Sequence, residues 1–306
     1  MLIKKIKYVR LKINIDMKRL NIIIIIALFI ISTNYTKAQN STSSSTSKFA
    51  LKVNMGPLLT KIKSDLFPAE ERSEYGFNIG ADLIYYYFNN GKIKANVSLG
   101  IGMTNYQASR RLNYAGTYTE MDYDNQMVNI TETANNLVEY QNLEYMDIPL
   151  KFGFDFTMTS KLDAYLSIGA TYGFKLKGMY DSKATLTRTG FYPDFNALLY
   201  DIDVAGSPYF YPQNKRMISR DNLALKNNLS LESALGVKYR FHDIVSAFVG
   251  IKYMHGFSNV IDEKGESIVR HDAGYNYSLN SVSFRNGKSQ TSGMGIEIGL
   301  QFKLGK

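Results

Sequence analysis

Acidic and basic side chains recur inside segments that are otherwise suited to burial, and they are the groups in this chain that could do chemistry. Each occupies an alternate position of a stretch with two-residue periodicity, opposite the large apolar residues. A buried charge is costly unless it is paired. The pattern therefore predicts an internal network of paired charges, with a gated path for protons or ions as the alternative. The candidates are Asp82, Asp147, Lys151, Asp155, Glu232, Lys238, Arg240, Lys252 and Glu297.

Two further expectations concern the members of this network. Lys252 and Glu297 lie at similar distances from the ends of neighbouring segments, so we expect them to meet near the middle of these segments. Lys94 and Lys175 also occupy alternate positions opposite the large apolar residues, and they are expected to point inward as well.

The remaining chemistry-bearing residues do not form a recognisable site. The three histidines, His242, His255 and His271, lie on different segments and show no metal-ligand spacing. No nucleophile is placed beside a base. The sequence therefore predicts no catalytic residue, no metal site and no cofactor, and we expect the protein not to be an enzyme.

The segment 143–176 shows most clearly which element positions the charges. Large apolar residues occupy every second position on both sides of a polar turn at 157–161, and the intervening positions are small or polar. Such alternation is typical of a strand with two different faces. The segment therefore predicts a β-hairpin with one apolar wall.

The same pattern recurs until it predicts an all-β fold, an eight-stranded antiparallel up-and-down transmembrane β-barrel. Short turns are expected around Asn90, Ser160 and Asp243, and Pro149 is expected to cause a local bulge or bend. The predicted strands are 49–56, 77–87, 93–104, 146–156, 162–176, 229–241, 245–254 and 294–304. Long loops are expected at 60–73, 109–141, 179–228 and 259–290.

The polar face decides between a membrane barrel and a soluble one. A soluble lipocalin-like barrel would need a charged outer surface. Here the second face carries mostly Gly, Ser, Thr, Asn and Ala, which suit a narrow interior. Aromatic residues of the apolar phase gather at both ends of the strands, as in the interfacial girdles of membrane barrels. They are Phe49, Tyr87, Phe156, Phe241 and Phe302 at one end, and Phe77, Tyr172, Phe174 and Tyr253 at the other.

The first residues have the organisation of a secretory signal peptide, which we assign to residues 1–38, with Met17 as an alternative start. Residues 39–47 form a Ser/Thr-rich linker, and residues 48–306 form the barrel. The leader contains eight Lys or Arg residues and one acidic residue, so most of the formal charge of +9 belongs to it. Nucleic-acid binding is therefore not expected.

Aromatic residues next to proline make the third long loop the best surface candidate for binding a partner. Exposed aromatic residues often mark protein contacts, although the loop could instead fold over the barrel mouth and bury them. The candidates are Phe191, Tyr192, Phe195, Tyr209, Phe210 and Tyr211.

The leader, strand count, loop asymmetry and final strand together resemble small outer-membrane barrels of the OmpX, OmpA and PorT kind. The segment 145–153, YMDIPLKFG, is similar to the "IPL" strand of PorT-like barrels. The chain departs from many such barrels in ending on Lys303–Lys306 after Phe302 rather than on an aromatic residue.

This resemblance implies a place in the outer membrane of a Gram-negative bacterium, with a periplasmic N-terminus and extracellular long loops. It also implies contact with outer-membrane lipid and insertion by the barrel-assembly machinery. We expect a non-enzymatic protein whose loops contact a partner or ligand, or which has an accessory role in envelope assembly or secretion. The alternative is a narrow channel for ions, water or small solutes.

Overall fold

The computed structural model describes residues 48–65, 69–121, 124–200, 215–262, 264–265, 267–271, 277–285 and 287–304. The signal peptide and linker that we predict at 1–47, and the candidates Tyr209, Phe210 and Tyr211, lie outside these residues. Within the described part, no helix is long and apolar enough to cross a membrane.

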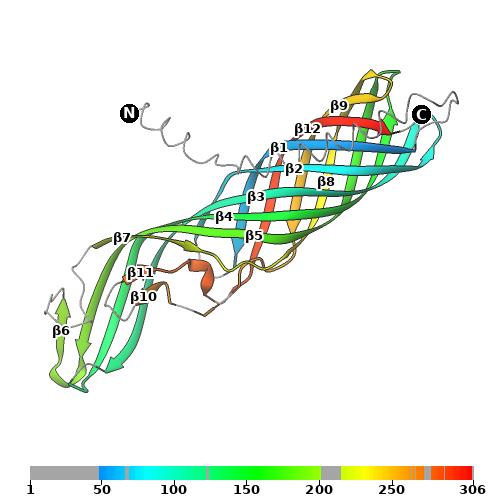
Figure 1. Ribbon diagram of the computed structural model, residues 1–306. Helices are drawn as coiled ribbons and strands as arrows, with labels where there is room; N and C mark the ends of the chain where they lie inside the picture. The colour runs from blue at the N-terminus through cyan, green and yellow to red at the C-terminus, as the bar shows by residue number, and fades with distance from the viewer. Residues whose placement is uncertain are drawn as a thin grey trace, which may run out of the picture.

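Eight long strands form a closed ring, so the predicted antiparallel up-and-down barrel is confirmed (Figure 1). Each strand pairs with its neighbour in the chain order, and the first pairs with the last, from Phe49–Leu304 to Ser64–Ser289. Closure leaves no free sheet edge in the ring, which is what a lipid environment requires. The ring strands are β1 (Phe49–Ser64), β2 (Glu70–Asn89), β3 (Ile93–Met121), β4 (Met127–Thr157), β5 (Leu162–Tyr192), β8 (Asn228–His242), β9 (Val245–Gly256) and β12 (Ser289–Leu304).

The predicted short turns join the strands at one end of the ring. At the first of them Gly91 has a φ of 82°, a value that glycine adopts without strain. Asn90 Oδ1 accepts hydrogen bonds from the backbone N–H groups of Lys92 and Ile93. The start of β1 and the end of β12 lie at this same end (Figure 1).

The two faces of the hairpin strands are oriented as the alternation predicts. On β4, Ile148, Leu150 and Phe152 are 39–52% exposed on the outer surface, whereas Asp147 and Lys151 are only 4–5% exposed in the interior. An apolar outer surface of this kind surrounds the barrel and extends for about ten residues along β4. That is about the length a tilted strand needs to span a bilayer. We call this surface the apolar belt.

Beyond the belt, strands occupy much of two predicted long loops and both ends of a third, 60–73. Instead of forming loops at 109–141 and 179–228, β3 and β4 remain paired out to Met121 and Met127, and β5 continues beside them to Tyr192. The outward positions here change from Leu, Ile and Phe to residues such as Thr117, Thr131 and Thr189. Threonine favours strands but is not apolar, so this sheet, which we call the extension, does not show hydrophobic alternation.

Smaller elements complete the extension (Figure 1). They are η2 (Pro193–Phe195), β6 (Ala197–Tyr200), β7 (Lys215–Asn222), β10 (Val269–His271), β11 (Tyr277–Leu279) and η3 (Val282–Phe284). The strands β6 and β7 pair with β5, and β10 and β11 form a separate hairpin. Residues from this hairpin and η3 pack against the extension in one apolar cluster, which includes Leu137, Leu186, Val269, Leu279 and Val282.

Pro149 does not cause the predicted bulge. The β4–β5 register passes through the Pro149–Thr171 pair without a shift, and the β3–β4 register is the same on both sides of Pro149. The reason is space on β3, because a Cβ added at Gly100 would lie 3.0 Å from Pro149 Cγ. Because Gly100 has no side chain, the ring of Pro149 fits against it and β4 continues as a regular strand.

A bulge occurs instead on β5, between the Glu144–Lys177 and Tyr145–Lys175 pairs, where Leu176 is the additional residue. Lys175 is exposed here, so its predicted place among the buried interior charges is wrong.

Candidate functional site: the interior charge network and the tip of the extension

The middle of the barrel holds a buried cluster of four charges from four strands. Lys151 Nζ lies 2.8 Å from Asp82 Oδ2 and 3.2 Å from Glu232 Oε1. Lys252 Nζ lies 2.9 Å from the same Glu232 oxygen and donates a hydrogen bond to Asn78 Oδ1 at 2.8 Å. Each charge thus has an opposite partner, as burial requires.

Glu297 belongs to a neighbouring cluster, and Lys252 pairs with Glu232 rather than with Glu297 as we expected. The carboxylate of Glu297 lies 3.0 Å from Lys52 Nζ and accepts a hydrogen bond from Tyr165 OH at 2.6 Å. Lys52 Nζ is 4.3 Å from the centre of the Phe248 ring, a favourable cation–π distance. Lys52 is not among the predicted members of the network, although it lies at an interior position of its strand.

A third cluster lies toward the short turns. Asp155 accepts hydrogen bonds from Lys238 Nζ at 2.7 and 2.8 Å and from Tyr86 OH at 2.8 Å. Arg240 lies at the rim, half-buried, 3.2 Å from Asp163, which also pairs with Lys94 at 3.2 Å. Asp163 is a second interior residue that is not among the predicted members of the network.

Asp147 marks the opposite boundary of the network. It is buried and accepts a hydrogen bond from the hydroxyl of Thr104, which in turn accepts one from Asn78. Within the described residues, Asp147 forms no ion pair. Its carboxylate is therefore held by a hydroxyl group on the neighbouring strand β3.

An apolar layer closes the barrel beyond Asp147. The next interior positions after Thr104, Asp147 and Lys252 are Tyr106, Tyr145 and Met254, and all three are at most 1% exposed. The rings of Tyr106 and Tyr145 meet edge to face with centroids 6.1 Å apart. Leu58, Val260, Ile261 and Phe284 belong to the same cluster. We call this cluster the mouth layer.

A buried carboxylate fastens the segment 281–284 to the extension beside the mouth layer. Glu139 is 0% exposed. It accepts hydrogen bonds from Ser281 Oγ at 2.9 Å, Val282 N at 2.8 Å and Ser182 Oγ at 2.9 Å. Arg110 adds a hydrogen bond to Ser283 Oγ at 2.9 Å. Burial lowers the pKa of the Arg110 guanidinium, and the Glu139 charge partly offsets this effect.

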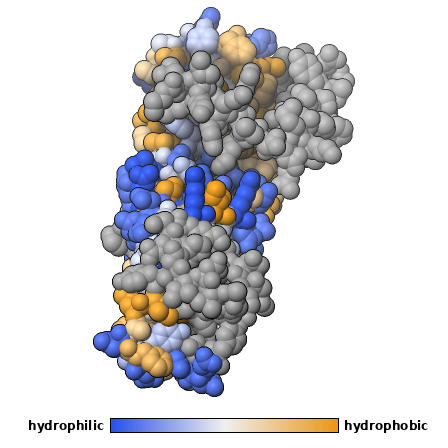
Figure 2. All heavy atoms as spheres, turned by 90° about the vertical axis from the view of Figure 1, so that its left-hand side faces the viewer, coloured by the Kyte–Doolittle hydropathy of each residue, from blue (hydrophilic) through white to orange (hydrophobic). Residues whose placement is uncertain are grey.

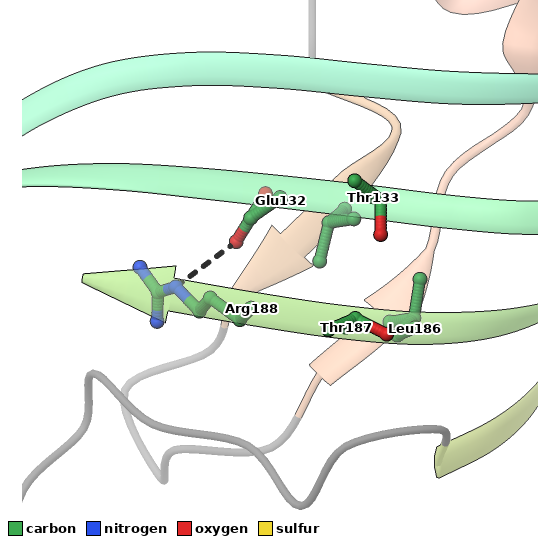
Figure 3. A pocket seen from close by; sticks show the side chains of 6 residues that line it. Glu132, Thr133, Leu186, Thr187 and Arg188 are labelled. Carbon is green, nitrogen blue, oxygen red and sulfur yellow. Dashed lines mark ion pairs between the residues drawn. The ribbon is translucent and has the colours of Figure 1, made fainter. Parts of the chain in front are cut away.

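A small cavity in the extension does not resemble a ligand site (Figure 3). It lies beside the ion pair of Glu132 and Arg188, whose Nε and Oε1 atoms are 3.3 Å apart. Tyr118 OH donates to Glu132 at 2.9 Å and accepts from Arg188 at 2.6 Å. The cavity volume of about 10 Å³ accommodates roughly one water molecule.

The tip of the extension carries the exposed apolar residues that lie farthest from the barrel. The pairing of Asn129 with Phe191 places the β5–β6 connection beside the β3–β4 turn. The exposed apolar side chains are Met121, Met127, Phe195 and Leu198, each 46–61% exposed. In Figure 2, which views the molecule from the left-hand side of Figure 1, hydrophilic residues prevail across the middle of the described surface, and apolar residues lie among hydrophilic ones near its lower end. We call these four residues the tip patch.

Three of the six predicted contact residues are described, and they lie at the tip. Phe195 belongs to the tip patch, and its ring centroid is 6.4 Å from that of Tyr192. Phe191 and Tyr192 are half-buried at the end of β5. None of these three lies over the barrel mouth, because η2 and β6 are at the far end of the extension (Figure 1).

The histidines that the structure describes take no part in a metal site. His242 is exposed near the third turn, and His255 lies between the rings of Tyr253 and Phe257 on the outer face of β9. Among the residues described, no group of three or more His, Asp or Glu side chains could hold a metal ion.

Comparison with known proteins finds similarity in solved structures alone. No protein-family model and no curated protein matches the chain. Neisserial surface protein A (NspA) is 13% identical with a TM-score of 0.35, over 84% of this chain and 97% of its own. Ail of Yersinia pestis, in complex with the heparin analogue sucrose octasulfate, is 12% identical with a TM-score of 0.27, over 83% and 99%.

Proposed function

We propose that this chain is an integral outer-membrane β-barrel protein of a Gram-negative bacterium. In this proposal it is non-enzymatic, and it presents the tip patch to a protein partner in the envelope or outside the cell. The observation that carries the proposal is the position of the tip patch at the end of an ordered sheet, well away from the apolar belt. Exposed apolar residues rimmed by polar ones are typical of protein contacts.

The orientation follows from general properties of such barrels. Their short turns face the periplasm, and their long connections face outward. We therefore place both ends of the described chain and the short turns in the periplasm, and the extension outside the cell. Insertion by the barrel-assembly machinery and contact with outer-membrane lipid belong to the same proposal. An accessory role in envelope assembly or secretion would use the same tip patch.

Site-specific crosslinking in intact cells tests the partner role. A photo-reactive phenylalanine analogue at position 195 should yield a defined crosslinked protein. Its yield should fall about tenfold in Met121→Ser and Leu198→Ser variants, because a few buried apolar residues dominate most interfaces. The same analogue at position 117, on the polar face of the extension, is the matched control and should yield none. Equal crosslinking from both positions, or no effect of the serine variants, would rule out the tip patch as the contact site.

The alternative function is a narrow channel, which the polar interior favours. Against it, ion pairs and the mouth layer fill the lumen, as side chains do in eight-stranded barrels. We expect the folded protein to show no single-channel steps in planar bilayers. The preparation should first be shown to be folded by its heat-dependent shift in electrophoretic mobility. Reproducible steps that disappear in a Glu297→Gln variant would support the channel instead.

A further inference from the structure

The bulge on β5 exposes four consecutive residues where the apolar belt ends. Phe174 and Leu176 are 38% and 44% exposed, and Lys175 and Lys177 between and after them are also exposed. In a regular strand two of these four would point into the barrel. The additional residue Leu176 removes that alternation, and bulges are known to redirect side chains in this way.

The segment that precedes β8 holds these four exposed residues in place. β8 begins only at Asn228, one residue after Asn227. The Lys175 N–H donates a hydrogen bond to Asn227 Oδ1 at 3.2 Å. Asn227 Nδ2 donates to Tyr172 OH at 2.9 Å. A third lysine, Lys226, therefore lies on the same rim, and its side chain is 47% exposed. Hydrogen bonds thus fix the backbone segments that carry the basic residues.

The surface on the membrane side of these lysines is aromatic and aliphatic. The rings of Tyr172 and Phe174 meet edge to face with centroids 4.9 Å apart, and both side chains are exposed on the outer face. Tyrosine at this level is typical of the membrane interface, and lysine stems extend along apolar surface to bring the ammonium group to the headgroups.

Nearby acids offset only part of the positive charge. Asp262 lies 3.1 Å from Lys226, and Glu144 lies opposite Lys177 in the strand register. In the part of the chain that the structure describes, neither Lys175 nor Lys177 forms an ion pair. Two cations thus remain available at headgroup height, above a surface that fits acyl chains.

We propose that Phe174–Lys177, with Lys226 and Tyr172, forms a binding site for a membrane lipid whose headgroup carries phosphate. Lys175 and Lys177 contact the phosphate oxygens, and Phe174, Leu176 and Tyr172 contact the acyl chains. The proposal rests on the proposed membrane location and is independent of the partner role of the tip patch.

Native mass spectrometry of the full-length protein in detergent tests the proposal, with diphosphoryl lipid A, monophosphoryl lipid A and phosphatidylcholine as probes. We expect retention to fall in that order. A Lys175→Gln/Lys177→Gln variant should bind diphosphoryl lipid A about thirtyfold more weakly, since each lysine near an anionic membrane surface contributes a factor of about five. Lys183→Gln, farther along the same strand, is the matched control and should bind like the wild type.

Three results would overturn the proposal. They are equal retention by the double variant, equal retention of phosphatidylcholine, and displacement of the lipid by inorganic phosphate, which would identify a free-phosphate site. A heat-dependent mobility shift in every variant shows that the barrel is folded. Loss of that shift in the wild type would instead refute the membrane barrel, so the two failures are distinguishable.

Discussion

Replacing Lys151 by methionine should lower the free energy of unfolding of the barrel by about 3–5 kcal/mol. The lysine neutralises Asp82 and Glu232 at the centre of the lumen, and all three side chains are at most 6% exposed. Methionine fills a similar volume but, among the described residues, leaves the Asp82 carboxylate without a cation in a closed interior, and leaves Glu232 with Lys252 alone. Breaking one partner of a buried ion pair is costly because the remaining charge is not solvated.

Urea titration of the protein in lipid vesicles, followed by the electrophoretic mobility shift, measures this effect. Lys161→Met, at the exposed second turn, is the control and should change stability by no more than about 0.5 kcal/mol. Equal stability of Lys151→Met and Lys161→Met would show that the interior is hydrated and that the charges are not paired as described.

Replacing Glu139 by alanine should release the segment 281–284 and leave the barrel itself closed. Four hydrogen-bond donors, from Ser281, Val282, Ser182 and Gln141, lose a buried acceptor. An unsatisfied buried donor costs about 1–3 kcal/mol, so the local opening of this segment should become about a hundredfold more frequent.

Trypsin cleavage after Arg285, next to this segment, reports that opening. The rate should rise about a hundredfold in Glu139→Ala, and Glu139→Gln should restore part of the protection because an amide oxygen still accepts a hydrogen bond. Glu144→Ala, on the outward phase of the same strand, should leave the rate unchanged. An unchanged rate in Glu139→Ala would mean that the apolar cluster alone holds the segment.

The barrel could be predicted from the sequence because lipid on one side and a narrow polar lumen on the other enforce strict alternation. The hairpin 143–176 shows both phases for many residues in succession, and apart from Lys175 the structure orients them as predicted. The extension could not be predicted in this way because its outer face meets water. Thr131 and Thr189 replace the apolar residues there, and hydrophobic alternation is lost although the strands continue.

The interior charges could be identified from their alternate positions in the strands, but their ion-pair partners could not. Glu297 pairs with Lys52 and Lys252 with Glu232, and these choices depend on side chains that reach across a closed ring. Lys175 has the interior phase in the sequence but is exposed in the structure, where it lies next to a bulge whose additional residue is Leu176. Only the register with β4 reveals that residue, and the register is a property of the folded pair.

Cysteine labelling in intact cells tests the central claim that the barrel spans the outer membrane with the extension outside. The chain contains no cysteine, so Phe195→Cys at the tip and Asn90→Cys at the first short turn are single reporters. With a membrane-impermeant maleimide, we expect Phe195→Cys to be labelled in intact cells and Asn90→Cys only after the outer membrane is permeabilised. Labelling of Asn90→Cys but not of Phe195→Cys in intact cells would contradict the claim.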